Sequence, residues 1–78
     1  MARTPVYMPK FGMTMTEGLI VEWHRRVGDS VAEGEALLTV ETEKVNTEVT
    51  APMTGKVAEI LFQNGDEVAV GEIIAYIE

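Results

Sequence analysis

The apolar and polar side chains of this 78-residue chain alternate with a period of two rather than 3.6. In residues 38–41, leucine and valine alternate with threonine and glutamate, and residues 20–24 show a similar pattern. No stretch carries the i, i+3, i+4, i+7 apolar spacing of an amphipathic helix. The pattern therefore predicts an all-β protein made of short strands.

A second pattern is an internal repeat with a shift of 37 residues. Residues 28–41 match residues 65–78 at seven of fourteen positions, including a Gly-Asp pair and a glycine six residues after its first member. Such residues suit turns, because glycine accepts positive φ and a short polar side chain can bond its own backbone. The two pseudo-repeats run from about residue 16 to 41 and from about residue 53 to 78.

Each pseudo-repeat is too small to bury its own apolar face, so the two are expected to pack together. We expect a single domain over residues 1–78, a flattened barrel-sandwich of two quasi-symmetric antiparallel sheets. A lone tryptophan in a strand is usually buried, and Trp23 is therefore assigned to the core. The expected core residues are Ile20, Trp23, Val31, Leu38 and Val40 from the first half, and Val57, Ile60, Val68, Ile74 and Ile77 from the second.

The segment between the repeats predicts a hairpin with its tip near Glu43-Lys44, because apolar alternation continues on both sides of this pair. Two-residue turns favour Gly, Asn or Asp, and this tip has none of them. Lys44 then has two interpretations. It is either a solvated charge of the kind that protects strand edges, or an attachment point displayed away from the body of the domain.

Four segments in this order carry a family resemblance: residues 8–18, residues 27–31, Glu41-Thr42-Glu43-Lys44-Val45 and residues 51–57. They resemble the opening strand and loop, the first Gly-Asp turn, the lipoyl-attachment sequence and the small-Pro-x-x-Gly segment of the biotinyl/lipoyl carrier domain family. The resemblance implies a lipoyl domain, as in the acyltransferase component of 2-oxo acid or acetoin dehydrogenase complexes. Lipoic acid would be joined by an amide to Lys44, with Glu43 and Val45 as flanking recognition residues.

The family's partners follow from the same resemblance. A lipoyl ligase or lipoyl transferase would load Lys44, and the arm would then swing between a thiamine-diphosphate dehydrogenase component, an acyltransferase catalytic domain and dihydrolipoyl dehydrogenase. The resemblance thus implies a carrier domain, in which no catalytic residue is expected. The opening segment is more similar to pyruvate and acetoin systems than to 2-oxoglutarate ones. Candidate partner-recognition residues are Phe11, Gly12, Met13, Thr14, Met15 and Glu41.

Several alternatives stay open. Methionine fills irregular gaps readily. The methionines of the opening loop and Phe11 therefore have two equally weighted interpretations, which are contact with partners and capping of the core. Lipoyl members often have Asp-Lys-Ala where this chain has Glu43-Lys44-Val45, whereas biotin-accepting members flank the lysine with methionines. A biotin carrier is therefore disfavoured. An unmodified barrel-sandwich interaction module is a further alternative, but it needs no lysine at the tip.

Composition narrows the possible functions further. The net charge of −7 disfavours nucleic acid and anionic membranes as partners. The chain has no cysteine, and its glutamates lack the glycine-containing loop of an EF-hand, so no metal site is expected. The single serine, Ser30, is assigned to a turn and the single histidine, His24, to a strand end, which disfavours a catalytic triad.

The start of the chain lacks the apolar stretch of a signal peptide, and no apolar run approaches the roughly 20 residues that span a bilayer. We expect a cytoplasmic protein, or one of the mitochondrial matrix if a transit peptide has been removed. The isolated domain is expected to be a monomer. The last strand of the repeat ends at Glu78, and in acyltransferase chains a linker and further domains would follow.

Overall fold

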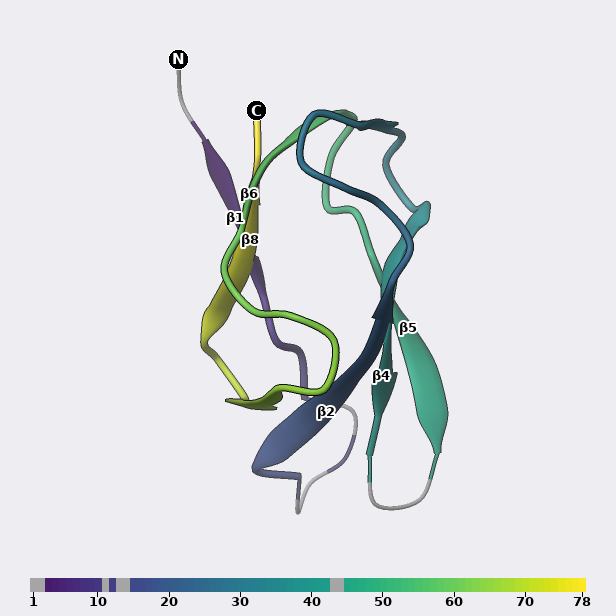
Figure 1. Cartoon of the computed structure of the whole chain (residues 1–78), viewed down its shortest axis with the longest axis vertical. Coiled ribbons are helices and arrows are strands. Elements are labelled where there is room, and N and C mark those ends of the chain that lie inside the picture. The colour runs from purple at the N-terminus through teal and green to yellow at the C-terminus, as the bar shows by residue number, and fades with distance from the viewer. Residues whose placement is uncertain (1–2, 11, 13–14, 43–44) are drawn as a thin grey trace.

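The structure, a computed structural model, describes residues 3–10, 12, 15–42 and 45–78. These residues form strands and no helix, which confirms the predicted all-β class (Figure 1). None of the described segments forms a helix that could cross a membrane. The strands are β1 (Thr4–Tyr7), β2 (Glu17–Trp23), β3 (Ser30–Val31), β4 (Ala36–Glu41), β5 (Asn46–Thr50), β6 (Gly55–Ile60), β7 (Glu67–Ala69) and β8 (Ile73–Ile77).

The strands are arranged in two four-stranded antiparallel sheets, with the orders β1-β8-β6-β3 and β5-β4-β2-β7. The predicted pair of quasi-symmetric sheets is confirmed. The halves of the chain do not each form one sheet, however. The short strand β3 of the first half pairs with β6 of the second, and β7 of the second half pairs with β2 of the first. The two halves therefore interlock.

Reciprocal backbone hydrogen bonds mark this exchange. The Gly28 amide donates to the carbonyl of Val57 at 2.8 Å, and the Gly65 amide donates to the carbonyl of Ile20 at 2.7 Å. A shift of 37 residues relates Gly28 to Gly65 and Ile20 to Val57, so each bond is the counterpart of the other in the repeat. The turns of one half are thus held by the strands of the other half.

The core lies between the two sheets and contains eight of the ten predicted residues as buried side chains. Trp23 and Ile60 are only half-buried and pack against its edge. The Trp23 indole N–H donates to the carbonyl of Phe62 at 2.8 Å, so its polar atom is satisfied near the surface. The core also contains buried residues that the repeat did not predict: Val6, Met8, Leu37, Val49, Ala51 and Ala75.

Register shifts explain why strict alternation does not describe the core. The pairing of β2 with β4 shifts between Ile20 and Glu22, and the pairing of β6 with β8 shifts between Val57 and Glu59, at the equivalent place in the repeat. A bulge adds one residue to one strand and so reverses the facing of the residues beyond it. Ile20 and Trp23, three residues apart, can therefore both contact the core.

The Gly-Asp turns adopt the predicted geometry. Gly28 and Gly65 have φ values of 96° and 93°, a region that side chains with a Cβ rarely adopt. The aspartate after each glycine accepts a hydrogen bond from the backbone N–H three residues earlier in the chain, Asp29 from Arg26 and Asp66 from Gln63, both at 2.8 Å. The expected bonding of a short polar side chain to its own backbone is confirmed.

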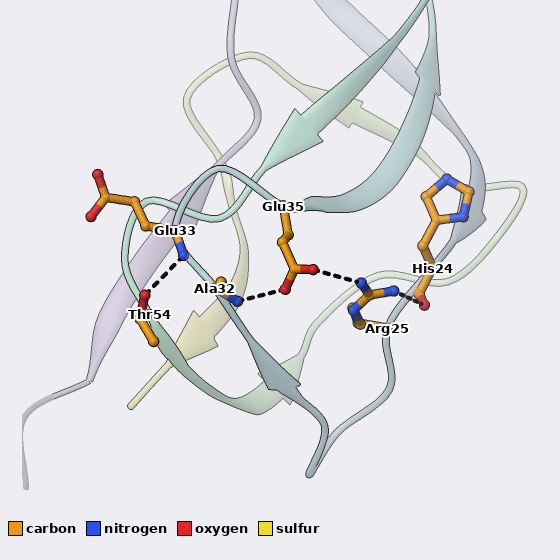
Figure 2. Close-up of polar contacts among 6 residues, drawn as sticks. All are labelled: His24, Arg25, Ala32, Glu33, Glu35 and Thr54. Atoms are coloured by element: carbon orange, nitrogen blue, oxygen red, sulfur yellow. Dashed lines mark hydrogen bonds and ion pairs between the residues drawn. The ribbon is translucent and has the colours of Figure 1, made fainter.

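One polar network breaks the symmetry of the two halves. Figure 2 shows the Glu35 carboxylate accepting the Ala32 N–H at 2.7 Å and the Arg25 guanidinium at 3.5 Å. Arg25 also donates to the carbonyl of His24 at 3.1 Å. In the second half the residue equivalent to Glu35 is Glu72, but Phe62 stands at the position equivalent to Arg25. Glu35 of the first half therefore has a cationic partner, Arg25, whereas the equivalent position in the second half holds an uncharged phenylalanine.

Substituting alanine for Gly28 or Gly65 should lower the free energy of unfolding by about 1–2 kcal/mol each, because a Cβ is strained at this φ. The position that a Cβ would take at either glycine has no atom of a non-neighbouring residue within 4 Å, so backbone strain alone should produce the loss. Asparagine tolerates positive φ better and should cost less than alanine. Urea denaturation of the four variants measures this, and equal losses for alanine and asparagine would contradict the explanation.

Replacing Glu35 by alanine should lower the free energy of unfolding by about 0.5–1.5 kcal/mol, because the Ala32 amide loses its acceptor and Arg25 loses its carboxylate partner. Glu72→Ala removes the equivalent carboxylate from the second half and is the matched control, with an expected change within about 0.5 kcal/mol. Thermal or urea denaturation of both variants provides the comparison. An equal loss in the two would show that the network adds no stability.

Candidate functional site

The predicted hairpin is formed by β4 and β5, whose register ends with Val40 opposite Thr47 and Glu41 opposite Asn46. Four residues, 42–45, therefore lie beyond the last strand pair. Glu43 and Lys44 fall outside the described residues, so the role of Lys44 and of its neighbour stays a prediction. The register itself agrees with the predicted reversal near this pair.

Thr42 and Val45 are bonded to each other at the base of this tip. The Thr42 amide donates to the carbonyl of Val45 at 2.8 Å. The Thr42 hydroxyl donates to the same carbonyl at 2.9 Å, and its oxygen accepts the Val45 N–H at 3.3 Å. Backbone and side chain of Thr42 thus bond to Val45, the next residue that the structure describes.

The hairpin has a buried stem and an exposed end. Val40 is fully buried and Val49 is 5% exposed, so the stem is anchored in the core. Val45, by contrast, is 56% exposed although it is large and apolar. Glu41 and Asn46, the last paired residues, are also exposed. An exposed valine directly after the predicted attachment lysine is available for contact with another protein.

The described part of the opening loop lies at the same end of the molecule as this hairpin (Figure 1). Leu19, near the start of β2, is paired with Glu41 at the end of β4, which brings the residues before β2 close to the hairpin. Gly12 is exposed, and its carbonyl accepts the Met15 N–H at 3.1 Å. Glu41 and Gly12 are therefore described surface residues of the predicted recognition set, whereas Phe11, Met13 and Thr14 fall outside the described residues.

Met15 packs partly against the core, as one of its two predicted interpretations requires. A Cβ placed on Gly18 would lie 2.7 Å from Val40 Cγ1, 3.1 Å from Met15 Cε and 3.2 Å from Met8 Sδ. Because Gly18 has no side chain, Met8 and Met15 can pack close to Val40 in the stem of the hairpin. The loop before β2 and the hairpin are joined by packing, and a role of Met15 in partner recognition stays a prediction.

The described residues line two open depressions on the surface of the domain. One is lined by residues such as Thr54 and Lys56 and the other by residues such as Trp23 and Asn64, and neither includes a described residue of the turn 42–45. No group of three or more metal-ligating side chains occurs in the part of the chain that the structure describes.

The sequence profile of the family described as biotin-requiring enzymes matches residues 4–77, nearly the whole chain. The chain belongs to the biotinyl/lipoyl domain family. The resemblance inferred from the four sequence segments is confirmed, since the match covers all of them.

Curated relatives of this family member are acyltransferase components. The chain is 47% identical over 76 residues to the acetyltransferase component of the pyruvate dehydrogenase complex of Corynebacterium glutamicum, covering 97% of this chain and 11% of that protein. It is 46% identical to the succinyltransferase component of the 2-oxoglutarate dehydrogenase complex of Staphylococcus saprophyticus, covering 92% and 17%. It is 40% identical to the acetyltransferase component of the acetoin cleaving system of Bacillus subtilis, covering 92% and 18%. The chain thus spans less than a fifth of the length of these relatives.

Two solved structures have the same fold as this biotinyl/lipoyl domain. The lipoyl domain of the 2-oxoglutarate dehydrogenase complex from Azotobacter vinelandii is 32% identical with a TM-score of 0.78, and the alignment covers 95% of this chain and 94% of that domain. The urea carboxylase of Kluyveromyces lactis is 29% identical with a TM-score of 0.84, covering all of this chain and 6% of that enzyme. The first comparison matches a lipoyl domain over nearly its full length, which further supports the predicted fold.

The biotinyl/lipoyl domain contains one candidate functional residue that the sequence pattern does not single out. Alternation assigns Thr42 only to a strand of the hairpin, yet the structure shows its hydroxyl closing the tip. The signal that could have found it is a hydroxyl residue beside a turn without Gly, Asn or Asp, because threonine can replace a backbone partner at such places.

Proposed function

We propose that this chain is a lipoyl carrier domain in which Lys44 bears lipoic acid through an amide bond. The observation that carries the proposal is the register of the β4–β5 hairpin. It leaves Glu43 and Lys44 as the two residues between the bonded pair Thr42 and Val45, at the end of a buried stem. The family includes both biotin- and lipoate-bearing domains, and the acyltransferase relatives favour lipoate.

The described residues fit a covalently attached arm. Such a group needs an attachment point that is fixed in the domain and exposed, because the group must enter active sites on other proteins. Val40 and Val49 fix the stem in the core, and the exposure of Val45 keeps the surroundings of the tip open to an attaching enzyme. Lipoic acid supplies a dithiolane that accepts acyl groups and electrons when it is bound. The chain itself supplies the position of that group.

Loss of the lysine charge and tethering of the cofactor to the domain would allow one small domain to serve several enzymes. An amide on Lys44 removes the positive charge of the amine, so the lysine acts neither as a base nor as a nucleophile. A rigid root with a long side chain raises the local concentration of the carried group at each partner without tight binding. The proposed partners are a thiamine-diphosphate dehydrogenase component, an acyltransferase catalytic domain, dihydrolipoyl dehydrogenase, and a lipoyl ligase or transferase.

The proposed recognition surface lies beside the attachment hairpin. Leu19 pairs with Glu41, so the exposed Gly12 and Glu41 belong to segments that meet at one end of the molecule. Partners would contact this end together with the tip residues Glu43 and Val45. The acidic residues would favour partners that present positive charge there. The proposed set is completed by Phe11, Met13, Thr14 and Met15.

Attachment to Lys44 can be tested by intact mass after incubation of the chain with lipoate, ATP and a lipoyl ligase. We expect one lipoyl adduct on the wild-type chain and none on Lys44→Arg. The chain offers two matched controls, since Lys10→Arg and Lys56→Arg change exposed lysines outside the hairpin and should retain the adduct. An adduct that survives Lys44→Arg would contradict the proposal, and an adduct with biotin and biotin ligase alone would favour the biotin carrier.

The complex that this domain serves can be tested by reductive acylation of the lipoylated chain. We propose a pyruvate- or acetoin-type complex, because the segment 8–18 resembles those systems more than 2-oxoglutarate ones, although relatives from all three systems are 40–47% identical to the chain. The rate of acylation should be highest with a pyruvate or acetoin dehydrogenase component and lower with a 2-oxoglutarate dehydrogenase component. Faster acylation by the 2-oxoglutarate enzyme would reverse this assignment.

A further inference from the structure

We propose that Thr42 is a positioning residue for the attachment reaction, acting through the closure of the hairpin tip. This inference rests on the proposed function, because it concerns the presentation of Lys44 to a lipoyl ligase. Thr42 does not touch the reacting amine in this proposal. It fixes the backbone on both sides of the two residues that lie between it and Val45.

The geometry at Thr42 carries the proposal. In a two-residue hairpin the flanking residues normally exchange two backbone hydrogen bonds. Here the Thr42 amide donates to the Val45 carbonyl at 2.8 Å, which supplies one of them. The Val45 amide donates to the Thr42 hydroxyl oxygen at 3.3 Å, and the hydroxyl donates to the Val45 carbonyl at 2.9 Å. The side chain thus serves as both donor and acceptor in closing the turn.

A comparison with other turns of the chain shows why a hydroxyl is needed. The turns at Gly28 and Gly65 reach positive φ with glycine, and each has an aspartate that bonds back to its own backbone. The tip between Thr42 and Val45 holds a glutamate and a lysine, and neither is a turn-forming residue. The attachment function requires a lysine there, so the tip itself cannot supply turn propensity. Thr42 supplies the closure from outside the tip.

An ordered tip should lower the free-energy cost of binding to the ligase. A ligase that binds a mobile turn must first order it, and that cost appears in the affinity of the encounter. Loss of the hydroxyl should therefore raise the KM of the ligase for the domain and leave kcat nearly unchanged, because the amine itself is unaltered. The core should be unaffected, since Val40 and Val49 are buried in it and the hydrogen bonds given for the hydroxyl go to the backbone of Val45.

The experiment uses the 78-residue chain and three variants. Thr42→Val keeps the β-branched shape and removes the hydroxyl, Thr42→Ser keeps the hydroxyl, and Thr50→Val is the matched control on an exposed threonine at the far end of the same strand pair. Lipoylation rates are measured by intact mass at several domain concentrations. Exchange of the Val45 amide hydrogen is followed by NMR, and unfolding midpoints are determined in urea.

We expect Thr42→Val to raise the KM for the domain and the exchange rate of the Val45 amide by about three- to tenfold each. Thr42→Ser should restore both values to within about twofold of wild type, and Thr50→Val should leave both unchanged. All variants should keep a cooperative unfolding transition, with at most a small shift of the midpoint in Thr42→Val, which would separate a local effect at the tip from general destabilisation.

Wild-type KM and wild-type exchange of the Val45 amide in Thr42→Val would overturn the inference. A raised KM that Thr42→Ser fails to restore would overturn it too, because the hydroxyl would not then be the cause. Failure of the proposed function would give a different result, since the wild-type chain itself would take up no lipoate. That result would also exclude a role of Thr42 in attachment.

Discussion

The exchange of short strands between the two halves is the constraint on which the rest of the structure depends. β3 completes the sheet of the second half and β7 completes the sheet of the first. The amides of Gly28 and Gly65 bond across the molecule to Val57 and Ile20. Neither half can complete its four-stranded sheet without the other, so the two pseudo-repeats stabilise each other. A chain of this length buries little surface, and such interlocking gives it a rigid body on which a hairpin can be mounted.

Much of this fold could be predicted because the repeat is visible in the sequence. The Gly-Asp turns, the buried Ile20 and Val57 and the central hairpin all follow from residues that recur after 37 positions or from the alternation between them. The burial of Val6 and Val49 could not be predicted in this way. They occupy equivalent places beside β8 and β4, opposite Ala75 and Leu38 respectively, but they are 43 residues apart and fall outside the repeat. The bulges were also hidden, since period-two alternation assumes an unbroken register.

The candidate site could be predicted only in part. Alternation on both flanks located the reversal near Glu43-Lys44, and the register of β4 with β5 agrees with it. The contribution of Thr42 could not be inferred from the sequence, because a threonine in an alternating strand has an ordinary explanation. Only the three bonds between Thr42 and Val45 show that one side chain takes the place of a turn-forming residue. The tip sequence Glu43-Lys44 contains no residue that favours turns, and the neighbouring Thr42 supplies the missing hydrogen bonds.

The pairing of β1 with β8 brings Thr4 opposite Ile77, at the other end of the long axis from the β4–β5 turn (Figure 1). The molecule measures 35 Å along this axis. Any polypeptide joined to either end of the chain would therefore emerge from the pole opposite the hairpin. The body of the domain would then separate such a polypeptide from a molecule that approaches the end with the β4–β5 hairpin.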